Sequence, residues 1–290
     1  MKGKPHEFSL SQECAKLARK HFARRLSHTW HGFEQLEYDD ERIRPKLITK
    51  TSLVADALPG IAMVEDLTLA GSRRTVGEDI VGTAFAADIR GYYLTAKHVI
   101  NGVQAGALRL QTNFQAPPQK GYGMYPFSVQ AVYPHPQLDV AVLAVPANAA
   151  KGRVSLPLQR EDVSVGTDIL LVGYPSGTDL IFCDEILGPK SSKSFSPVAF
   201  NGIICARVPD DIRPIELLVY DSTTFGGNSG APVISVESGS IVGLHLRGLE
   251  NHVGYAVPIQ KCLAFVDAVA EAHEPRRQQY PSNSEHKARR

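Results

Sequence analysis

Residues 221–230 read Asp-Ser-Thr-Thr-Phe-Gly-Gly-Asn-Ser-Gly. Ser229 has Gly226, Gly227 and Gly230 as close neighbours, and glycine permits backbone angles and close approaches that a Cβ atom would prevent. Such a loop can direct amide N–H groups toward a negative charge that develops beside the serine hydroxyl. Because the residues on either side look extended, the stretch also fits a glycine-rich turn between two strands. A base elsewhere in the chain, and an acid to orient it, would favour the first interpretation.

A histidine follows a predicted strand in the first half of the chain. The strand Tyr92–Thr95 continues into Ala96-Lys97-His98, and a rigid strand would hold the imidazole in the fixed position that a general base needs. A histidine in this place can equally be a core or surface residue that hydrogen-bonds to the backbone. His98 is a candidate base only if other residues support that role.

One carboxylate stands at the start of an otherwise apolar strand, Leu138-Asp139-Val140-Ala141-Val142-Leu143. A carboxylate is costly to bury there unless other groups hydrogen-bond to it. Paired with His98, Asp139 would fix the imidazole tautomer and stabilise the imidazolium that forms when a serine loses its proton. The alternative is an aspartate that caps the strand at the surface.

Together these residues favour a catalytic interpretation of the serine loop, because each has its own recognisable context. The motifs Leu94–His98, Leu138–Leu143 and Gly226–Val233 resemble the chymotrypsin-like (trypsin-like) serine peptidase family, and the resemblance covers roughly residues 58–272. The pattern is most similar to bacterial glutamyl-endopeptidase-like and Deg/HtrA-like protease domains. Unlike Deg/HtrA proteases, the chain is expected to have no PDZ domain, since too few residues follow Ala272.

The resemblance implies a role for each residue. Ser229 would be the nucleophile, His98 the general acid and base, and Asp139 the orienting carboxylate. The backbone N–H groups of Gly227 and Ser229 would form the oxyanion hole. The implied reaction is hydrolysis of a peptide bond through an acyl-enzyme, in a cleft between two barrels. Asn228 stands where secreted members often have an aspartate, so activation by a new N-terminus is not expected.

The resemblance also bears on the specificity pocket. In this family the residue six positions before the serine often lies at the floor of the pocket. Here it is Thr223, which cannot pair with the cation of a lysine or arginine substrate. Thr224 and His245 match the residues with which glutamyl endopeptidases bind glutamate, and viral 3C-like peptidases use a comparable histidine for glutamine. Both side chains can donate to a carboxylate or an amide oxygen. In the alternative interpretation His245 hydrogen-bonds within the barrel, and the pocket takes an apolar side chain.

The remaining pattern predicts an all-β body. Short runs rich in Val, Ile, Leu, Thr and Tyr, punctuated by Gly and Pro, begin after Pro45 and form two sets of about six strands. They predict two six-stranded antiparallel barrels. We expect a helical extension at residues 1–50, a protease domain at 51–272 and a mobile tail at 273–290. Within the domain the barrels are expected at about 51–157 and 158–258, followed by a helix at 259–272.

Composition limits the partners that we expect. With 31 basic and 30 acidic residues the formal charge is +1, so no overall field favours nucleic acid or an anionic membrane. No apolar run is long enough for a signal peptide or a membrane span. The four cysteines show no metal-ligand spacing, and the histidines at 21, 28 and 31 have no accompanying cysteine pair. We expect no cofactor, no metal, no nucleic acid or membrane partner, and a cytoplasmic location.

The sequence therefore predicts an intracellular serine endopeptidase that cleaves a protein or peptide after Glu or Gln. The alternative is a catalytically latent protease-fold adaptor that uses the cleft or the N-terminal helix to hold another protein. The N-terminal extension, with its basic amphipathic pattern, is the candidate site for a regulatory protein partner.

Overall fold

The structure is a computed structural model that describes residues 49–69, 80–88, 90–114, 123–146, 156–175, 197–249 and 252–279. The helix predicted for the N-terminal extension lies outside the described residues, as does the chain beyond residue 279. The predictions for these segments therefore stay predictions.

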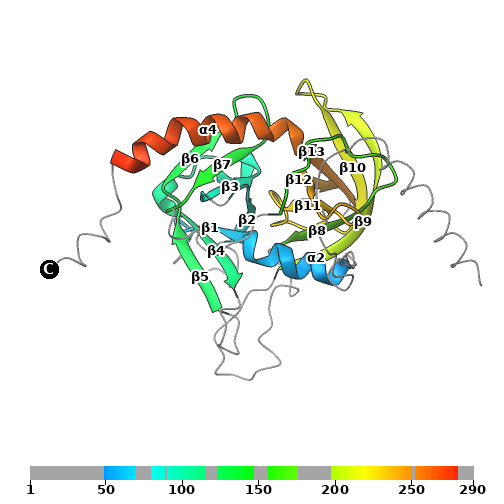
Figure 1. Ribbon diagram of the computed structural model, residues 1–290, viewed down its shortest axis with the longest axis horizontal. Coiled ribbons are helices and arrows are strands. Elements are labelled where there is room, and N and C mark those ends of the chain that lie inside the picture. The colour runs from blue at the N-terminus through cyan, green and yellow to red at the C-terminus, as the bar shows by residue number, and fades with distance from the viewer. Residues whose placement is uncertain are drawn as a thin grey trace, which may run out of the picture. The chain divides into compact units, whose positions relative to one another are not determined.

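The first half of the described chain forms a seven-stranded antiparallel sheet in the order β5-β4-β1-β2-β3-β7-β6 (Figure 1). The strands are β1 (Ile61–Asp66), β2 (Ile80–Ala86), β3 (Tyr92–Thr95), β4 (Leu108–Phe114), β5 (Gly123–Ser128), β6 (Ala131–Pro134) and β7 (Ala141–Ala144). Tyr92–Thr95 is confirmed as a strand, paired with β2 on one side and β7 on the other.

The sheet curls so that its two edge strands, β5 and β6, are consecutive along the chain. The sequence predicted about six strands in the first barrel, and the structure has seven because β5 and β6 are separate strands. The backbone changes its partner between them: the amide of Val129 donates to Leu108 at 3.2 Å, and that of Gln130 donates to Ala144 at 2.8 Å. The chain thus crosses from β4 to β7 at this point and joins the two edges of the sheet.

The second half of the described chain forms a closed barrel of six strands in the order β10-β13-β12-β11-β8-β9. The strands are β8 (Asp168–Gly173), β9 (Val198–Pro209), β10 (Glu216–Ser222), β11 (Pro232–Ser235), β12 (Ile241–Leu249) and β13 (Val253–Pro258). The predicted all-β double barrel is confirmed.

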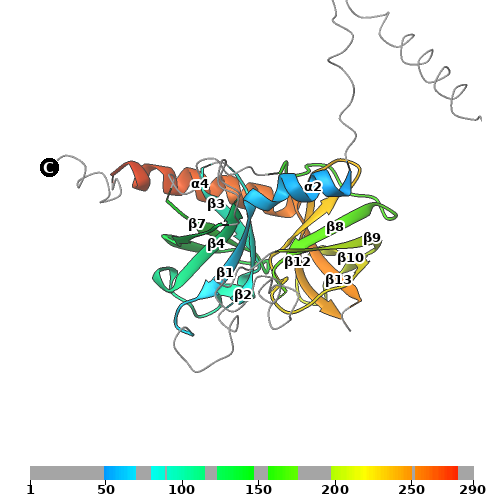
Figure 2. The ribbon, with the colours of Figure 1, turned by 90° about the horizontal axis from the view of Figure 1, so that it is seen from below.

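Two α-helices lie along one side of the barrels (Figure 2). The first, α2 (Lys50–Ala57), starts with a capping box in which Thr49 and Ser52 bond to each other's backbone amides, and the 3₁₀ helix η1 (Leu58–Gly60) links it to β1. Two further 3₁₀ helices, η2 (Lys97–Ile100) and η3 (Ala105–Ala107), follow β3. At the start of α2, the hydroxyls of Thr49 and Ser52 accept hydrogen bonds from amides that the helix itself leaves unpaired.

The C-terminal helix α4 (Gln260–Gln279) leaves β13 of the second barrel and packs on the first. The Phe265 ring lies 4.7 Å from the His135 ring, and the His273 ring lies 5.6 Å from the Tyr133 ring. His273 Nδ1 also lies 3.2 Å from the Tyr92 hydroxyl. The sequence placed the end of this helix at residue 272, and the structure corrects that boundary to Gln279.

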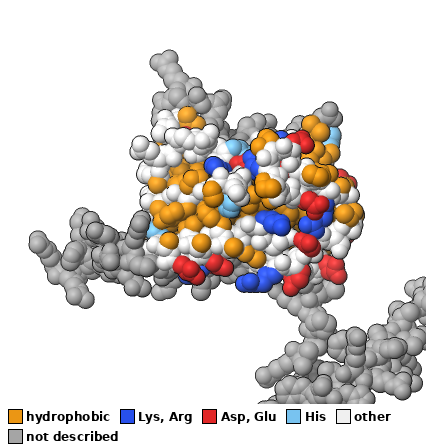
Figure 3. Space-filling view, turned by 90° about the horizontal axis from the view of Figure 1, so that it is seen from above, with side chains coloured by type: hydrophobic (Ala, Val, Ile, Leu, Met, Phe, Trp, Pro, Cys, Tyr) orange, Lys and Arg blue, Asp and Glu red, His pale blue; other side chains and the backbone are white. Residues whose placement is uncertain are grey.

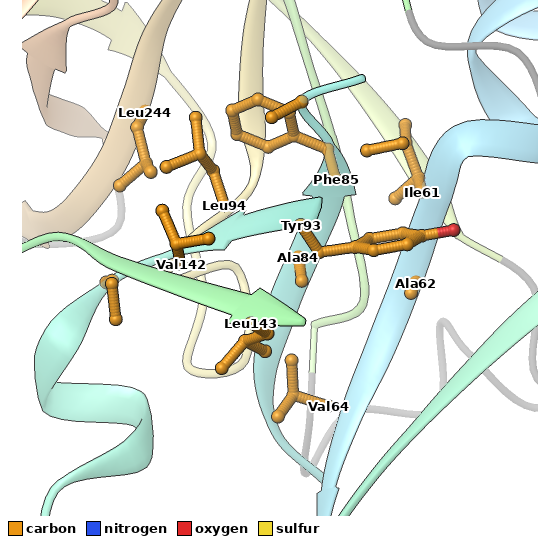
Figure 4. Packing of buried hydrophobic residues seen from close by; sticks show 14 of the residues in the cluster. Ile61, Ala62, Val64, Ala84, Phe85, Tyr93, Leu94, Val142, Leu143 and Leu244 are labelled. Atoms are coloured by element: carbon orange, nitrogen blue, oxygen red, sulfur yellow. The ribbon is translucent and has the colours of Figure 1, made fainter. Parts of the chain in front are cut away.

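Alternation along β8 explains how the barrels share a core. Ile169 and Leu171 point into a cluster inside the second barrel. Leu170 and Val172, on the opposite face of the strand, belong to the larger cluster that fills the first barrel. Leu244 of β12 enters the same large cluster beside residues of β2, β3 and β7 (Figure 4). Each such buried side chain contributes roughly 1.5–3 kcal/mol, so the interface between the barrels is itself part of the core.

Candidate active site

The first barrel places His98 and Asp139 at one end of the sheet. His98 stands in η2, directly after β3, where Val99 and Ile100 are buried and fix the turn. Asp139 comes two residues before β7. The turn ahead of it is held by His135, whose Nδ1 accepts the amides of Gln137 and Leu138 at 3.0 and 2.9 Å. Both side chains are therefore set by rigid local structure.

His98 and Asp139 are joined by two hydrogen bonds. His98 Nδ1 lies 2.9 Å from Asp139 Oδ2, and the His98 backbone amide donates to Oδ1 at 2.9 Å. Burial of the carboxyl raises its pKa, but the hydrogen bonds and charge of His98, together with the charge of Arg213, outweigh burial, so the pKa of Asp139 lies below its usual value. An ionised Asp139 keeps the Nδ1 proton of His98 in place and leaves Nε2 as the free ring nitrogen.

Ser229 of the second barrel lies on the same cavity but is turned toward its own barrel. The cavity has a volume of about 480 Å³, and His98, Asp139 and Ser229 all line it. The Ser229 hydroxyl donates to the carbonyl oxygen of Leu246 at 3.0 Å. Among the described residues it makes no hydrogen bond to His98. The predicted residues are thus brought together, with the serine in a rotamer that does not yet engage the base.

In the serine loop, amides without and with a hydrogen-bond partner among the described residues alternate from Gly227 to Gly230. The amides of Asn228, Gly230 and Ala231 donate to the carbonyls of Phe225, His245 and Asn228 at 3.2, 2.8 and 2.8 Å. Those of Gly227 and Ser229 have no hydrogen-bond partner among the described residues. Gly227 has φ of +84°, a conformation that glycine adopts without strain. Since most buried amides are paired, the Gly227 and Ser229 amides are available to donate to a ligand, and the oxyanion-hole role expected of them stays a prediction.

The predicted pocket residues Thr224 and His245 line the same cavity. Both are 1% exposed, and the Thr224 hydroxyl has no partner in the described part of the chain. The Tyr220 hydroxyl lies 2.6 Å from His245 Nδ1, a partner that sequence analysis did not identify. Thr223, expected at the pocket floor, is instead exposed and is absent from the described lining of the cavity.

Burial controls the protonation of this pair. Burial, helped by the charge of His98, lowers the pKa of His245 to about 3. Burial also raises the pKa of Tyr220 well above its usual value. At neutral pH the imidazole is therefore uncharged and the phenol keeps its proton. When the phenol donates a hydrogen bond to Nδ1, the uncharged imidazole carries its own hydrogen on Nε2, which can then donate to a ligand.

Arg213 is a further charged residue at the site that the sequence did not reveal. Its Nη2 lies 3.8 Å from Asp139 Oδ2, while its Nη1 donates to Asp210 Oδ2 at 2.9 Å. Asp210 also accepts the amide of Ile212 at 3.0 Å, which stiffens the loop between β9 and β10. A cation of the second barrel thus touches the carboxylate of the first.

Other surface features bear on partners. On the face shown in Figure 3, acidic and basic side chains are intermingled rather than gathered by sign. None of the described helices is both long and apolar enough to cross a membrane. Within the described ranges, no three His, Cys, Asp or Glu side chains are grouped to hold a metal ion. Cys205 and Cys262 are free, whereas Cys14 and Cys183 lie outside the described residues.

Two antiparallel barrels that share a cavity lined by a histidine–aspartate pair and a serine define the chymotrypsin-like class. The sequence profile of the trypsin-like peptidase domain matches residues 82–244, more than half of the chain. The chain therefore belongs to the trypsin-like peptidase family, and the resemblance inferred from the three motifs is confirmed.

Relatives of known activity cover the chain only in part. A glutamyl endopeptidase of Staphylococcus epidermidis is 28% identical over 173 residues, which are 57% of this chain and 54% of that protein. The chloroplastic protease Do-like 1 of Arabidopsis thaliana is 27% identical over 192 residues, which are 64% of this chain and 38% of that protein. The chain thus matches about half the length of the first relative and less of the second.

Structures of bacterial proteases share the fold. The HtrA-type protease AlgW with a decapeptide aligns with a TM-score of 0.57 and 18% identity over 77% of this chain and 68% of that chain. The inactive form of Rv3671c from M. tuberculosis aligns with a TM-score of 0.51 and 20% identity over 78% and 94% of the two chains. These matches support the double barrel.

Proposed function

We propose that this chain is a serine endopeptidase in which Ser229 attacks the substrate carbonyl and His98 accepts the serine proton. Asp139 would stabilise the resulting imidazolium, and the free amides of Gly227 and Ser229 would bind the oxyanion. As the C–N bond breaks, His98 would give the proton to the leaving amine and an acyl-enzyme would remain; a water activated by His98 would then release the acyl group as a carboxylic acid and restore the Ser229 hydroxyl. The family membership and the two hydrogen bonds between His98 and Asp139 support this proposal.

The mechanism requires the Ser229 side chain to rotate. Its hydroxyl must leave the Leu246 carbonyl and turn toward His98 Nε2. Serine side chains exchange between staggered rotamers quickly and with small differences in energy. The lost hydrogen bond costs about 1 kcal/mol, which a bond to His98 would offset.

We propose that the pocket selects glutamine or glutamate at the residue before the cleaved bond. The observation that carries this proposal is that the same cavity is lined by a buried, uncharged His245 and by a buried Thr224, whose hydroxyl has no partner in the described structure. Both groups can donate hydrogen bonds to a side-chain oxygen. An apolar side chain would leave them unpaired, at roughly 1–3 kcal/mol each.

The charge of His245 separates the two substrates. An uncharged imidazole suits the amide oxygen of glutamine. The carboxylate of glutamate lacks a countercharge from His245 unless the imidazole takes up a proton, or unless Arg247, which also lines the cavity, supplies the charge. A bound carboxylate favours protonation of the imidazole. The ratio of cleavage after glutamate to cleavage after glutamine should therefore rise as pH falls from 8 to 5.

The test uses peptides that differ only in having Glu, Gln or Leu before the cleaved bond, together with an unspecific activated ester. His245→Leu should reduce kcat/KM for the Glu and Gln peptides about 100-fold and leave ester hydrolysis nearly unchanged. Thr223→Ala, which changes an exposed neighbour, is the matched control. Equal losses on peptide and ester would rule out a role of His245 in the pocket.

A latent, non-enzymatic adaptor is the second candidate, because the Ser229 hydroxyl is bonded to Leu246 rather than to His98. A fluorophosphonate probe separates the two functions. The endopeptidase should be labelled at Ser229, and Ser229→Ala should not be labelled. A chain that resists labelling at any pH, while remaining folded, would favour the adaptor.

Three predictions from the sequence remain proposals. They are the domain boundary at residue 50, the cytoplasmic location, and the interaction of residues 1–50 with a regulatory protein. Removal of residues 1–48 tests the last of these, since a regulatory segment should change kcat/KM while the domain stays folded.

A further inference from the structure

Thr83 on β2 of the first barrel is joined to the serine loop of the second by two hydrogen bonds. Its hydroxyl donates to the carbonyl oxygen of Gly227 at 2.7 Å, and its amide donates to the carbonyl oxygen of Ser229 at 2.8 Å. The hydroxyl also accepts the amide of Tyr174 at 3.0 Å. Thr83 therefore fixes the carbonyl groups of Gly227 and Ser229, the two residues whose amides are proposed to bind the oxyanion.

The surroundings of Thr83 are closed. Thr83 is fully buried, and its carbonyl accepts the Thr95 hydroxyl at 2.7 Å. A Cβ atom on Gly173 would lie 3.1 Å from the Thr83 hydroxyl, and one on Gly230 would lie 2.1 Å from the Thr83 carbonyl oxygen. A valine in this position would fill the space, so a water molecule could not replace the lost hydroxyl. The Gly227 carbonyl and the Tyr174 amide would then each lose the hydrogen bond to Thr83.

Each contact acts on the orientation of a peptide group. A peptide unit is planar, so fixing the Gly227 carbonyl fixes the peptide that leads to Asn228 and limits rotation about the Cα–C bond of Gly227, whose φ is +84°. The turn from Phe225 to Asn228, closed at 3.2 Å, then orients the Gly227 amide. Fixing the Ser229 carbonyl likewise limits rotation about the residue that carries the second free amide.

We propose that Thr83, in the first barrel, is a positioning residue that holds the serine loop in the conformation in which the Gly227 and Ser229 amides can bind an oxyanion. This inference rests on the proposed roles of Gly227 and Ser229. Since the oxyanion exists only during the reaction, misplaced amides raise the barrier without weakening substrate binding. The loop is in this way assembled by contact between the barrels and needs no new N-terminus.

The test compares Thr83→Val, which keeps the shape and removes the hydroxyl, with Thr83→Ser, which keeps the hydroxyl. Thr83→Val should lower kcat about 10- to 100-fold with KM within about 3-fold, below the roughly 100- to 1,000-fold typical of a lost oxyanion donor. Thr83→Ser should retain kcat within about 3-fold. Both variants are compared at temperatures well below their unfolding transitions.

Two readouts separate positioning from a merely structural role. A peptide aldehyde forms a tetrahedral adduct, so its affinity should fall by the same factor as kcat/KM in Thr83→Val. Peptide binding, measured in a Ser229→Ala background, should change by less than about 3-fold. Equal losses of kcat in Thr83→Val and Thr83→Ser, or an unchanged aldehyde affinity in Thr83→Val, would overturn the proposal.

A third readout does not depend on turnover. In the Ser229→Ala background, backbone amide exchange at residues 226–230 should speed up at least 10-fold with Thr83→Val and stay within about 3-fold with Thr83→Ser. Unchanged exchange with Thr83→Val would overturn the proposal even if the protein has no peptidase activity. Absent activity with the expected exchange would instead count against the proposed function alone.

Discussion

The two barrels present their shares of the candidate site in different states. In the first barrel, His98 and Asp139 are joined by two hydrogen bonds of 2.9 Å. In the second, Ser229 is bonded to its own barrel, and the neighbouring Asn228 is fully buried with a side-chain amide that has no partner among the described residues. The contact between His98 and Asp139 is thus already formed, whereas the Ser229 side chain of the serine loop must rotate before it can reach His98.

The largest expected effect separates the two halves chemically. Ser229→Ala should lower kcat by about 10⁴-fold or more, and His98→Ala should do so to a similar extent, because triad residues act as a unit. The double variant should be no worse than either single variant. Peptide hydrolysis under single-turnover conditions measures this, and losses that multiply in the double variant would contradict a shared mechanism.

The tight contact between serine loop and first barrel can be tested with two glycines. Gly230→Ala should destabilise the protein by about 3 kcal/mol or more, because its φ is +87° and the new Cβ would lie 2.1 Å from the Thr83 carbonyl oxygen. Gly166→Ala is the matched control, with φ of +93° but open space around the Cβ. It should cost only about 1 kcal/mol. Urea unfolding distinguishes the two, and equal losses would show that backbone strain alone decides.

The buried histidine of the second barrel should make the stability of the protein depend on pH. His245 is 1% exposed, and its pKa of about 3 lies below the ordinary value of 6.5. Between these values the unfolded chain binds a proton that the folded chain does not, so stability falls as pH is lowered. From pH 7 to 5 this group should cost about 2 kcal/mol. His245→Leu should remove that share of the slope in urea unfolding, and parallel slopes would contradict the low pKa.

The smallest effect concerns Arg213, the cation that reaches from one barrel to the other. Burial raises the pKa values of Asp139 and Asp210, but the charge of Arg213 is among the causes that hold both below their usual value. A lowered carboxyl pKa stabilises the folded chain at neutral pH, and this contribution is lost as pH falls through the folded pKa. Arg213→Gln should therefore reduce the free energy of unfolding by about 0.5 kcal/mol at pH 7 and by less at pH 3. Arg213→Lys, which keeps the charge, should reduce it less. Equal losses at both pH values in urea unfolding would show that Arg213 does not act through these carboxylates.

Sequence reasoning identified the residues that short motifs carry. His98 and Asp139 each sit in a local turn next to an apolar strand, so their contexts were readable without the fold. Thr83, by contrast, meets Gly227 across 144 positions of sequence. Nothing around Thr83 distinguishes it from an ordinary strand residue, and only the docking of the barrels gives it a partner.

Most strands were predictable for similar reasons. The errors concern element boundaries and the place of Thr223, which the pattern of apolar and polar residues does not determine. Apolar and polar residues alternate from Phe127 to Ala131, across the point where the strand changes its partner, so the break between β5 and β6 left no signal in the sequence. The segment after residue 272 was predicted to be a mobile tail. The helix nevertheless continues to Gln279, through arginine and glutamine residues, which are good helix formers. Thr223 was placed by its spacing from the serine, which does not determine its exposure.

The helix α4 ties the two barrels mechanically. Just before the helix begins, the Ile259 amide donates to the carbonyl oxygen of Val242 in the second barrel at 3.0 Å. Further along the helix, His273 lies against Tyr92 and Tyr133 of the first barrel. Together with a core that draws leucines from both barrels, this linkage should make heat denaturation a single cooperative event. Neither barrel would then survive as an independent folding unit, and the cleft could not be lost by partial melting while both barrels persist.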